Sequence, residues 1–533
     1  MWQNSINSSS SALPRLISAF ISSPVSAEKG VLVIIAVGTL FRIVAGWGIG
    51  LGFGESYYFS AALRPSMGYL DQPPLAILTA SLSMYLTGAV GPLVIRLPFI
   101  IMFALTTWLI FLLGKRLFGP WSGFYAALLF NLSAVFTLTT AIFFQPDGPL
   151  MLFWLLSVLC LLKIFFDSPV EHPYFWWAAT GVTLGLTLLS KYHAIFIIFG
   201  AGMFAITFRN ERHWIWHPGS YMAMVIALII FSPTIIWNYQ NNWISFVWQG
   251  SRGLDYQGIR IDWLIRSILG QAVWLLPWIW APLLWELFKN FRRGPQSKER
   301  WFIAWMAVAP IAFFTLTAAY APLGYHSHWL APGYLMLFLS LGDTLHKRLL
   351  QGDKKSRQWL VGSLVFTCVA LTFVTTHAAT GWSRILIPQV LKKKLEKAKD
   401  PSVESFDYST LEAAFTKHGL FEKKDLFVFT NRWFQSGKVD YALKGKRPVL
   451  CLNPDDPRSF AFWYKPEEWL GKDGILVSSK KFLNDPASYY GNYFSKIEFL
   501  GTVEIPRGKY IEETLYLHYM HNYHTPFPMP YQR

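Results

Sequence analysis

The chain of 533 residues is 53% hydrophobic, 17% aromatic and only 15% charged, a balance that excludes an ordinary soluble domain and indicates a protein that crosses a membrane many times. Its formal net charge of +16 comes from short basic clusters between apolar runs, which is typical of membrane loops and not of a nucleic-acid-binding surface. Three cysteines are too few for a disulfide framework.

Apolar runs of membrane-spanning length dominate the chain after residue 30. Residues 1–30 are serine-rich and polar, and the apolar patch at 16–21 is too short to span a bilayer. The first run that approaches the roughly 20 residues needed is 31–50. The further runs are 93–113, 121–143, 148–166, 175–190, 192–208, 220–238, 263–288, 301–320, 328–345 and 359–378. We therefore expect a mainly α polytopic membrane protein with about 11 transmembrane helices.

Basic clusters mark alternate loops, and Lys and Arg beside short loops stay on the cytoplasmic side. The clusters are Lys115-Arg116, Arg209 with Arg212, 289–300 and 347–357. The opposite loops are 52–92, 145–148, 191–193, 238–262 and 321–328, and these are predicted to be external. An odd number of spans also places everything after about residue 380 outside.

The composition changes after residue 380. A basic run, LKKKLEKAKD, precedes β-rich stretches such as DLFVFT, PVLCLN, GILVSS and FLGTVEI, bounded by Gly, Pro and Asp. We predict a cytoplasmic segment at 1–30, a transmembrane domain at 31–380 and a small external α/β domain at 381–533. The chain contains no zinc-type spacing, P-loop or dinucleotide fingerprint.

The first external loop carries the most informative stretch, GESYYFSAALRPSMGYLDQPPLAIL at 54–78. We interpret Glu55 and Asp71 as candidate catalytic acids, with Tyr57 and Tyr58 as candidate substrate contacts. Structural alternatives remain open for both acids. Glu55 suits the first turn of a helix, where a carboxylate compensates the dipole, and Asp71 before Gln and two prolines suits a helix N-cap.

Two further external turns carry charged side chains. Asp147 in QPDGPLMLFW is a third acid on the predicted external side; helix capping explains it, but acids near a bilayer also tend to mark ligand sites. Lys191, Tyr192 and His193 form a short turn between two apolar runs. Lys191 either snorkels to the interface or binds a lipid-linked phosphate as a point charge.

Arginines on the same side extend the candidate phosphate contacts. Arg64, Arg252 and Arg260 lie in predicted external loops, and Arg96 lies just inside the second span. A guanidinium group can bind phosphate through two parallel hydrogen bonds, so we expect one or more of them to contact the same ligand as Lys191.

GYHSHWLAPGY brings His326 and His328 to the external face. Two histidines at this spacing, together with Asp71, would suit a divalent metal ion. A polar loop rich in aromatic residues explains the same pattern without a metal.

Three motifs resemble the membrane glycosyltransferases of the GT-C fold, specifically family 39 and the related bacterial lipid A and lipopolysaccharide-core transferases. GESYYFSAALRPSMGYLDQPPL is similar to that group's first-loop pattern, Asp-Glu-Ala-Tyr-Tyr-Trp followed by Gly-Tyr-Phe-Asp-His-Pro-Pro. QPDGPLMLFW resembles its Pro-Asp-x-Pro-Leu-x-x-Phe-Trp signature, and GLTLLSKYHA its Gly-Leu-x-x-x-Ser-Lys-Tyr segment. The motifs keep their order, and the resemblance covers roughly residues 30–340.

The resemblance implies an acid of the first loop at or near Glu55 and a second acid at Asp71. The chain departs from the pattern twice: Gly54 stands where an acid is usual, and Gln72 where a His is usual. The base is then Glu55 or Asp71, and the sequence leaves both open.

The implied reaction is sugar transfer from a polyprenyl phosphate, with inversion, at the outer face of a bacterial inner membrane. A carboxylate would take the proton of the acceptor hydroxyl, and external cations would stabilise the leaving phosphate. Lipid A or lipopolysaccharide core is the favoured acceptor. The alternatives are a protein acceptor, as in O-mannosylation, and a transporter or flippase of polyprenyl-linked lipids.

Overall fold

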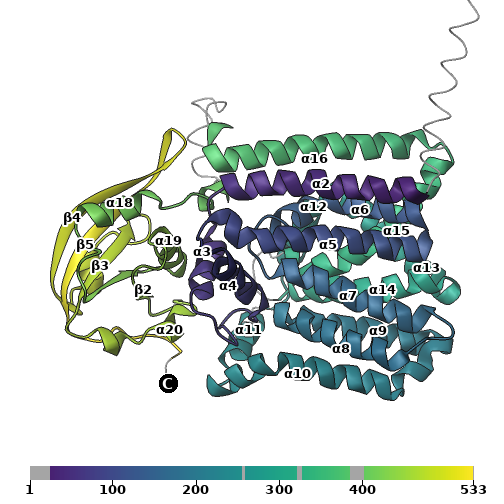
Figure 1. The fold of residues 1–533 in the computed structure, drawn as a ribbon, viewed down its shortest axis with the longest axis horizontal. Coiled ribbons are helices and arrows are strands. Elements are labelled where there is room, and N and C mark those ends of the chain that lie inside the picture. Colours follow the sequence, from purple (N-terminus) through teal and green to yellow (C-terminus); the bar gives the residue numbers. More distant parts are fainter. Residues whose placement is uncertain (1–23, 255–257, 321–326, 384–400, 532–533) are drawn as a thin grey trace, which may run out of the picture.

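The computed structural model describes residues 24–254, 258–320, 327–383 and 401–531. The helices up to Thr380 are α2 (Pro24–Gly48), α3 (Phe53–Ala62), α4 (Leu75–Thr87), α5 (Pro92–Phe118), α6 (Pro120–Leu132), α7 (Asp147–Phe166), α8 (Pro173–Ser190), α9 (Ile195–Thr207), α10 (Pro218–Gln240), α11 (Ile244–Leu254), α12 (Ile261–Leu275), α13 (Pro277–Arg293), α14 (Lys298–Thr317), α15 (Ala331–Leu350) and α16 (Lys354–Thr380). The long helices from α2 to α16 form a bundle with their axes roughly aligned, and the short helices α3, α4 and α11 lie at one end of it (Figure 1).

Every apolar run predicted to span the membrane coincides with a helix or a broken helix. The run 121–143 is broken, because α6 ends at Leu132 and a short π-helix, η1 (Phe136–Thr140), follows. The run 263–288 is also broken: Leu276 has φ +70° before Pro277, and α12 and α13 meet at 110°. Within the described residues, six helices are long and apolar enough to cross a membrane, or seven if the bent pair is one span. The number 11 therefore stays a prediction.

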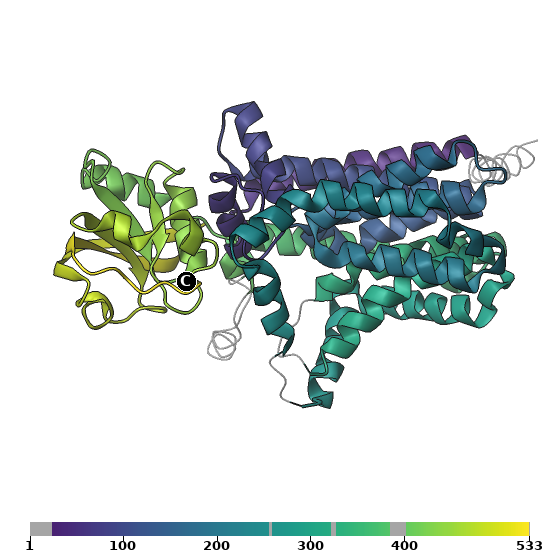
Figure 2. The same ribbon diagram turned by 90° about the horizontal axis from the view of Figure 1, so that it is seen from below.

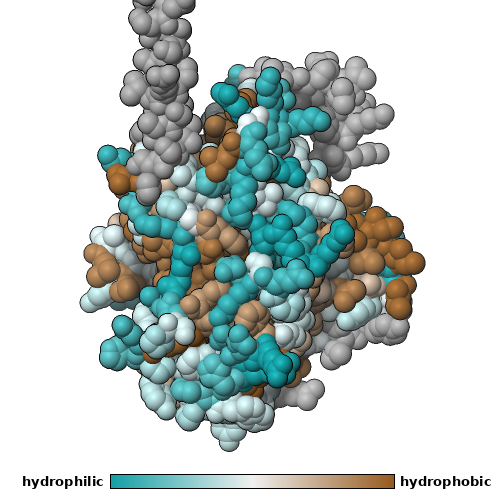
Figure 3. Space-filling view, turned by 90° about the vertical axis from the view of Figure 1, so that its right-hand side faces the viewer, coloured by the Kyte–Doolittle hydropathy of each residue, from teal (hydrophilic) through white to brown (hydrophobic). Residues whose placement is uncertain are grey.

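The basic loops lie at the end of the bundle that is farthest from the C-terminal region. Lys298 at the start of α14 donates to the carbonyl of Phe165 at the end of α7 and pairs with Glu211 after α9. Arg116 at the end of α5 pairs with Asp167 after α7. Figure 3 looks onto this end, where hydrophilic residues cover much of the face and hydrophobic residues lie toward its sides. We call it the far end.

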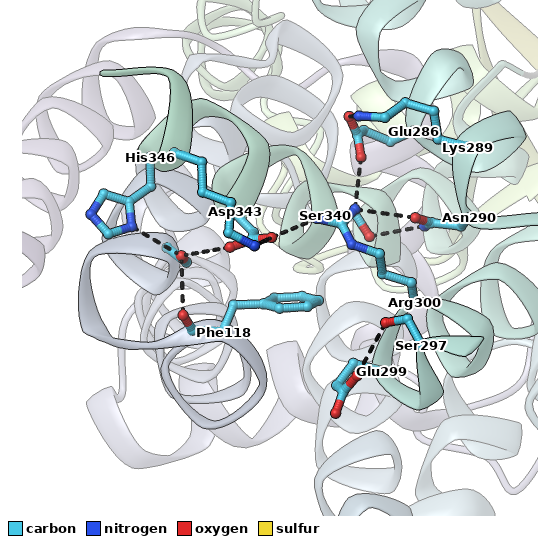
Figure 4. A network of polar contacts seen from close by, with 12 residues as sticks. Phe118, Glu286, Lys289, Asn290, Ser297, Glu299, Arg300, Ser340, Asp343 and His346 are labelled. Atoms are coloured by element: carbon cyan, nitrogen blue, oxygen red, sulfur yellow. Dashed lines mark hydrogen bonds and ion pairs between the residues drawn. The ribbon is translucent and has the colours of Figure 1, made fainter. Parts of the chain in front are cut away.

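A buried polar network fastens three helices at the far end (Figure 4). Arg300 of α14 donates to Glu286 of α13 at 3.0 Å and to Asp343 of α15 at 2.5 Å. Asn290 bonds both Arg300 and Ser340. All five side chains are buried. Lys289 pairs with Glu286 at 2.7 Å and Lys347 with Asp343 at 2.8 Å, so each of the two buried carboxylates has a cation besides Arg300.

The C-terminal region contains a five-stranded mixed sheet in the order β2-β1-β3-β5-β4. Its strands are β1 (Leu426–Thr430), β2 (Val449–Cys451), β3 (Asp473–Ser479), β4 (Phe494–Arg507) and β5 (Tyr510–Tyr523). Strand β1 pairs in parallel with β2 and β3, and β5 runs antiparallel to β3 and β4. Its helices are α18 (Thr410–Lys417), α19 (Trp433–Ala442), α20 (Phe460–Trp463) and α21 (Pro486–Tyr490). This is the small α/β region predicted from the β-rich stretches.

The sheet region lies at one end of the bundle only, in both Figure 1 and the view turned by 90° (Figure 2). Helices α3 and α4 of the first loop lie between it and the long helices. The Lys438 ammonium, buried in α19, donates to the carbonyl oxygens of Leu51 at 3.0 Å and Glu404 at 2.8 Å. Burial lowers the pKa of Lys438 to about 8. The first loop is thus enclosed between the two regions.

Candidate active site

Glu55 is buried in the first turn of α3, and its carboxylate is fully bonded. Arg96 of α5 donates from Nε to Oε1 at 2.8 Å and from Nη2 to Oε2 at 2.6 Å. The backbone N–H groups of Gly52 and Phe144 donate to the same carboxylate at 3.0 and 2.8 Å. The predicted first-turn role is confirmed in part, since the bond to Gly52 is that of a capping box.

Arg96 ties this carboxylate to the end of α2. Its Nη1 donates to the carbonyl oxygens of Gly46 at 2.9 Å and Ile49 at 2.5 Å, and Nη2 donates to that of Gly50 at 2.9 Å. An ionised carboxylate has about four acceptor positions, and Glu55 accepts four hydrogen bonds. This geometry favours a positioning role for Glu55 over proton transfer to a substrate.

Asp71 has a more open environment in the loop between α3 and α4. Its side chain is buried, and Oδ1 accepts from the Tyr57 hydroxyl at 2.9 Å. Oδ2 lies 3.4 Å from Nη1 of Arg458, in the C-terminal region. Helix α4 begins at Leu75 with Pro74 as its N-cap, so the alternative that Asp71 caps this helix is wrong. Part of its acceptor capacity is left for a ligand.

The electrostatic surroundings of Asp71 suit a base. Burial raises the pKa of its carboxyl above the ordinary value, while the Arg458 charge and the hydrogen bond from Tyr57 act in the opposite direction. Burial and the Asp71 charge likewise raise the pKa of Tyr57 well above its usual value, so its hydroxyl stays protonated and donates. A general base is most effective when its pKa approaches the working pH.

Asp147 and Lys191 form a second buried pair. The Lys191 ammonium lies 3.0 Å from Oδ1 and 3.1 Å from Oδ2 of Asp147. Asp147 is the first residue of α7, and its side chain caps no helix, so the predicted capping role is wrong. Burial and the charges of Asp71 and Asp147 raise the pKa of the Tyr58 hydroxyl well above its ordinary value, so this hydroxyl stays protonated.

The two residues after Lys191 pack among aromatic rings. Tyr192 lies against Phe231 and Phe246, with ring centroids 6.1 and 5.4 Å away, and its hydroxyl is within the electrostatic reach of Asp71. His193 stacks on Phe314 at 4.7 Å. Its Nε2 is buried and has no hydrogen-bond partner in the part of the chain that the structure describes.

Two of the predicted external arginines, Arg64 and Arg260, pair with carboxylates other than Asp71. Arg64 donates to Asp440 at 2.8 Å and to the Tyr464 hydroxyl at 3.0 Å, so it fastens α3 to the C-terminal region. Arg260 is exposed and pairs with Asp262 at 3.0 Å. Arg252 belongs to α11, but its side chain lies outside the described residues.

The predicted metal contacts are only partly within the described residues. His326 lies outside the described residues, and His328 lies in the short helix η5 (Ser327–Leu330) beside Trp329. Across the described ranges, no group of three or more His, Cys, Asp or Glu side chains is arranged to hold a metal ion. The divalent metal therefore stays a prediction.

Position 54, where the resembled pattern has an acid, lies in the first turn of α3 beside Gln145. An ideal Cβ on Gly54 would lie 3.5 Å from Nε2 of Gln145, which is an ordinary contact. Packing therefore does not require glycine here.

Sequence reasoning missed two contacts from the C-terminal region. Arg458 is 387 residues from Asp71, and the Ser459 Oγ lies 2.8 Å from the Tyr57 hydroxyl. Ser459 Oγ also accepts from the backbone N–H of Leu70 at 3.2 Å. The only local signal was the charged run at 455–458, which has no motif that would place it beside the first loop.

A family model matches part of the chain. Residues 71–237 match the family described as dolichyl-phosphate-mannose-protein mannosyltransferase. A search of curated proteins finds no match.

Solved structures of similar fold cover most of the chain. ArnT from Cupriavidus metallidurans in the apo state gives a TM-score of 0.63 at 13% identity, over 92% of this chain and 98% of that one. The same protein bound to undecaprenyl phosphate gives 0.62 at 14% identity, over 92% and 97%. The archaeal oligosaccharyltransferase AglB from Archaeoglobus fulgidus, in complex with an inhibitory peptide and a dolichol-phosphate, gives 0.50 at 11% identity, over 86% and 70%. The chain therefore has the GT-C fold of polytopic membrane proteins, and its residues 71–237 match the protein mannosyltransferase family.

Proposed function

We propose that the chain is an inverting glycosyltransferase that moves a sugar from a polyprenyl phosphate to an acceptor of the bacterial envelope, with lipid A or lipopolysaccharide core favoured. The observation that carries this proposal is Asp71, a buried carboxylate with open acceptor capacity beside Tyr57. The fold supports it, because a structure that matches over nearly its whole length is bound to undecaprenyl phosphate.

Asp71 is the proposed base. The acceptor hydroxyl attacks the anomeric carbon, Asp71 Oδ2 takes its proton, and the bond from that carbon to the phosphate oxygen breaks. The electron pair leaves with the polyprenyl phosphate. Tyr57 fixes Oδ1 by its hydrogen bond, so Oδ2 is the oxygen that is better placed to accept a proton.

Lys191 is the proposed contact for the leaving phosphate. Its ammonium is held by both oxygens of Asp147, which keeps the cation in place before the donor arrives. Stabilising the charge that develops on a leaving oxygen is an electrostatic role that a preorganised cation performs well. Glu55 and Arg96 hold the end of α2, α3 and α5 together beneath this site.

We further propose that the protein is a multi-pass component of the bacterial inner membrane, with the site and residues 381–533 on the periplasmic side. The basic loops at the far end support this orientation, because such clusters stay cytoplasmic. The proposed division is 1–30, 31–380 and 381–533. Tyr58, Tyr192 and His193 are retained as proposed substrate contacts around the two acids.

A protein acceptor is the second candidate, favoured by the family match over residues 71–237. It requires the same donor and the same base, and differs only in the hydroxyl that attacks. The acceptor used by the cell distinguishes the two.

The test is sugar transfer by the full-length chain in proteoliposomes that contain polyprenyl-phosphate-linked aminoarabinose, galacturonic acid or mannose in separate arms. Lipid A and a Ser/Thr-containing peptide serve as alternative acceptors, and products are detected by mass spectrometry. Envelope lipids and glycoproteins of cells with and without the protein are compared in parallel. Transbilayer movement of the labelled donor lipid with no transfer in any arm, and no missing envelope glycan, would contradict the proposal and favour a flippase.

A further inference from the structure

The segment at 453–463 of the C-terminal region reaches across to the first external loop. Ser459 contacts both Tyr57 and Leu70 through its hydroxyl, and Phe460 and Trp463 of α20 pack against the Tyr57 ring at 6.1 Å each. The residue that Asp71 depends on for orientation, Tyr57, is thus held from the C-terminal side.

Several contacts hold the Arg458 side chain next to Asp71. Its guanidinium lies 4.9 Å from the ring of Trp248, in α11, and 4.7 Å from the ring of Trp433, in α19. Its Nε pairs with Asp456 at 3.1 Å and its Nη1 lies 3.4 Å from Asp71 Oδ2. Aromatic rings from two parts of the chain and a second carboxylate therefore fix the direction in which this cation points.

The backbone at Arg458 is held in a costly conformation. Its φ is +54°, in the left-handed region that residues with a Cβ rarely adopt. Asn453 supports the preceding turn, because its Oδ1 accepts from the N–H groups of Asp455 and Asp456 at 2.8 Å. Strain of this kind persists where the surroundings impose it, and it is concentrated at functional sites.

The contact between α19 and α3 keeps this segment in register with the loop. An ideal Cβ on Gly437 would lie 2.6 Å from the backbone nitrogen of Tyr57, so only glycine allows the two helices to approach so closely. Phe434 also stacks on Phe53, with ring centroids 4.4 Å apart. Trp433 of α19 also contacts Arg458, so the close packing of α19 on α3 holds one side of Arg458 near the first loop.

We propose that the C-terminal region completes the active site, with Arg458 as a positioning residue that holds the Asp71 carboxylate ready to accept the acceptor's proton. This inference rests on the proposed function of Asp71 as the base. Arg458 acts on the carboxylate and not on the substrate. The site is then incomplete in the helical bundle alone.

The electrostatic consequence follows from the groups that face Asp71. Among the side chains that the structure describes, the titratable groups that interact electrostatically with Asp71 are Tyr57 and Tyr58 from α3, Tyr192 from the turn after α8, and Asp456 and Arg458 from the C-terminal segment. Arg458 is the cation among them and favours the ionised carboxylate, whereas Asp456 and burial oppose it. Removing the Arg458 charge must raise the pKa of Asp71 further, so the base loses its charge at a higher pH.

The experiment measures kcat and KM for sugar transfer against pH, in proteoliposomes, for the unaltered chain and three variants. Arg458→Ala removes the charge, Arg458→Lys keeps it, and Arg432→Ala removes an exposed arginine of the same region. We expect Arg458→Ala to move the acidic limb of the kcat profile upward by about one pH unit and to lower kcat about tenfold below that limb. Because Arg458→Lys keeps the positive charge, its acidic limb should stay close to that of the unaltered chain. Arg432→Ala should match the unaltered chain.

An unshifted limb in Arg458→Ala would overturn the inference, and so would a change confined to the donor KM, which would make Arg458 a phosphate contact. If Arg458→Ala does not fold, Arg458→Gln is compared with Arg458→Lys, and equal limbs in these two variants would overturn it as well. Absence of transfer by the unaltered chain would overturn the proposed function itself, whereas transfer with unshifted limbs would overturn only the role of Arg458.

Discussion

The two ends of the helical bundle use buried carboxylates and arginines in different ways. At the far end, Arg300 binds Glu286 and Asp343 at 3.0 and 2.5 Å, and its side chain is 4% exposed (Figure 4). At the end beside the sheet, Asp71 and Arg458 meet at 3.4 Å, and Arg458 is 21% exposed. The far cluster is closed, whereas the near pair has a gap and access to solvent.

This difference distinguishes charges that stabilise the fold from charges that remain available to a ligand. A closed cluster has offset its desolvation by its own hydrogen bonds, so breaking it leaves an uncompensated buried charge. An open pair keeps acceptor capacity for a ligand and relies on its neighbours for orientation. Glu55 shows that the distinction does not follow position, because it shares the first loop with Asp71 and yet is closed by Arg96.

The largest effect is expected for Asp71→Asn. Asparagine keeps an oxygen for the Tyr57 hydroxyl but cannot take a proton at neutral pH, so kcat should fall about 10²–10⁴-fold, the usual contribution of a positioned base. The thermal unfolding midpoint should stay close to that of the unaltered chain. Turnover of labelled donor measures the first quantity, and wild-type turnover in this variant would remove Asp71 from the chemistry.

Glu55→Gln is expected to act on stability first. The change leaves the buried Arg96 charge without its carboxylate, which should lower the free energy of unfolding by about 3–5 kcal/mol. The double variant Glu55→Gln with Arg96→Met removes both charges and is the matched control, expected to recover part of the loss. If Glu55→Gln instead kept full stability and lost turnover, Glu55 would be the base, and the closed-versus-open distinction would fail at this residue.

Arg300→Lys tests the far end with a smaller change. Lysine keeps one positive charge but cannot bind Glu286 and Asp343 together with the planar fork of arginine. We expect a loss of about 1–3 kcal/mol in unfolding free energy, with kcat and both KM values unchanged in the folded fraction. A change in the pH profile of transfer would show that the two ends are coupled, against the expectation.

The fold could be predicted from sequence where the signal is local. Apolar runs predicted the helices, and β-rich stretches between turn residues predicted the sheet region. Both signals are contained within a single short segment of the sequence. The two broken runs were missed. Leu276 has a positive φ before Pro277, and the apolar character of the run 263–288 does not reveal the 110° bend inside it.

The site could be predicted only as far as its motifs extend. The first-loop pattern pointed to Asp71 and its tyrosines, and Tyr57 does bond Asp71. The pattern could not show that Glu55 is saturated, since that depends on how α5 packs Arg96 against the end of α2. The contact of Arg458 with Asp71 could not be predicted either, because it forms only when the distant C-terminal region packs against the first loop.

Lys191→Ala gives the smallest expected effect. It tests whether the Lys191–Asp147 pair binds the donor phosphate or only stabilises the fold. The pair is nearly as buried as the far cluster, with side chains 7% and 2% exposed, but the proposed donor phosphate requires Lys191 as a ligand. If Lys191 binds the donor phosphate, Lys191→Ala raises the donor KM about tenfold, equivalent to about 1.4 kcal/mol, and leaves kcat little changed. Asp147→Asn, the matched variant, frees the ammonium and should keep or lower that KM. A loss of stability in both variants with an unchanged KM would place the pair with the closed clusters, because only a structural pair responds alike to the removal of either partner.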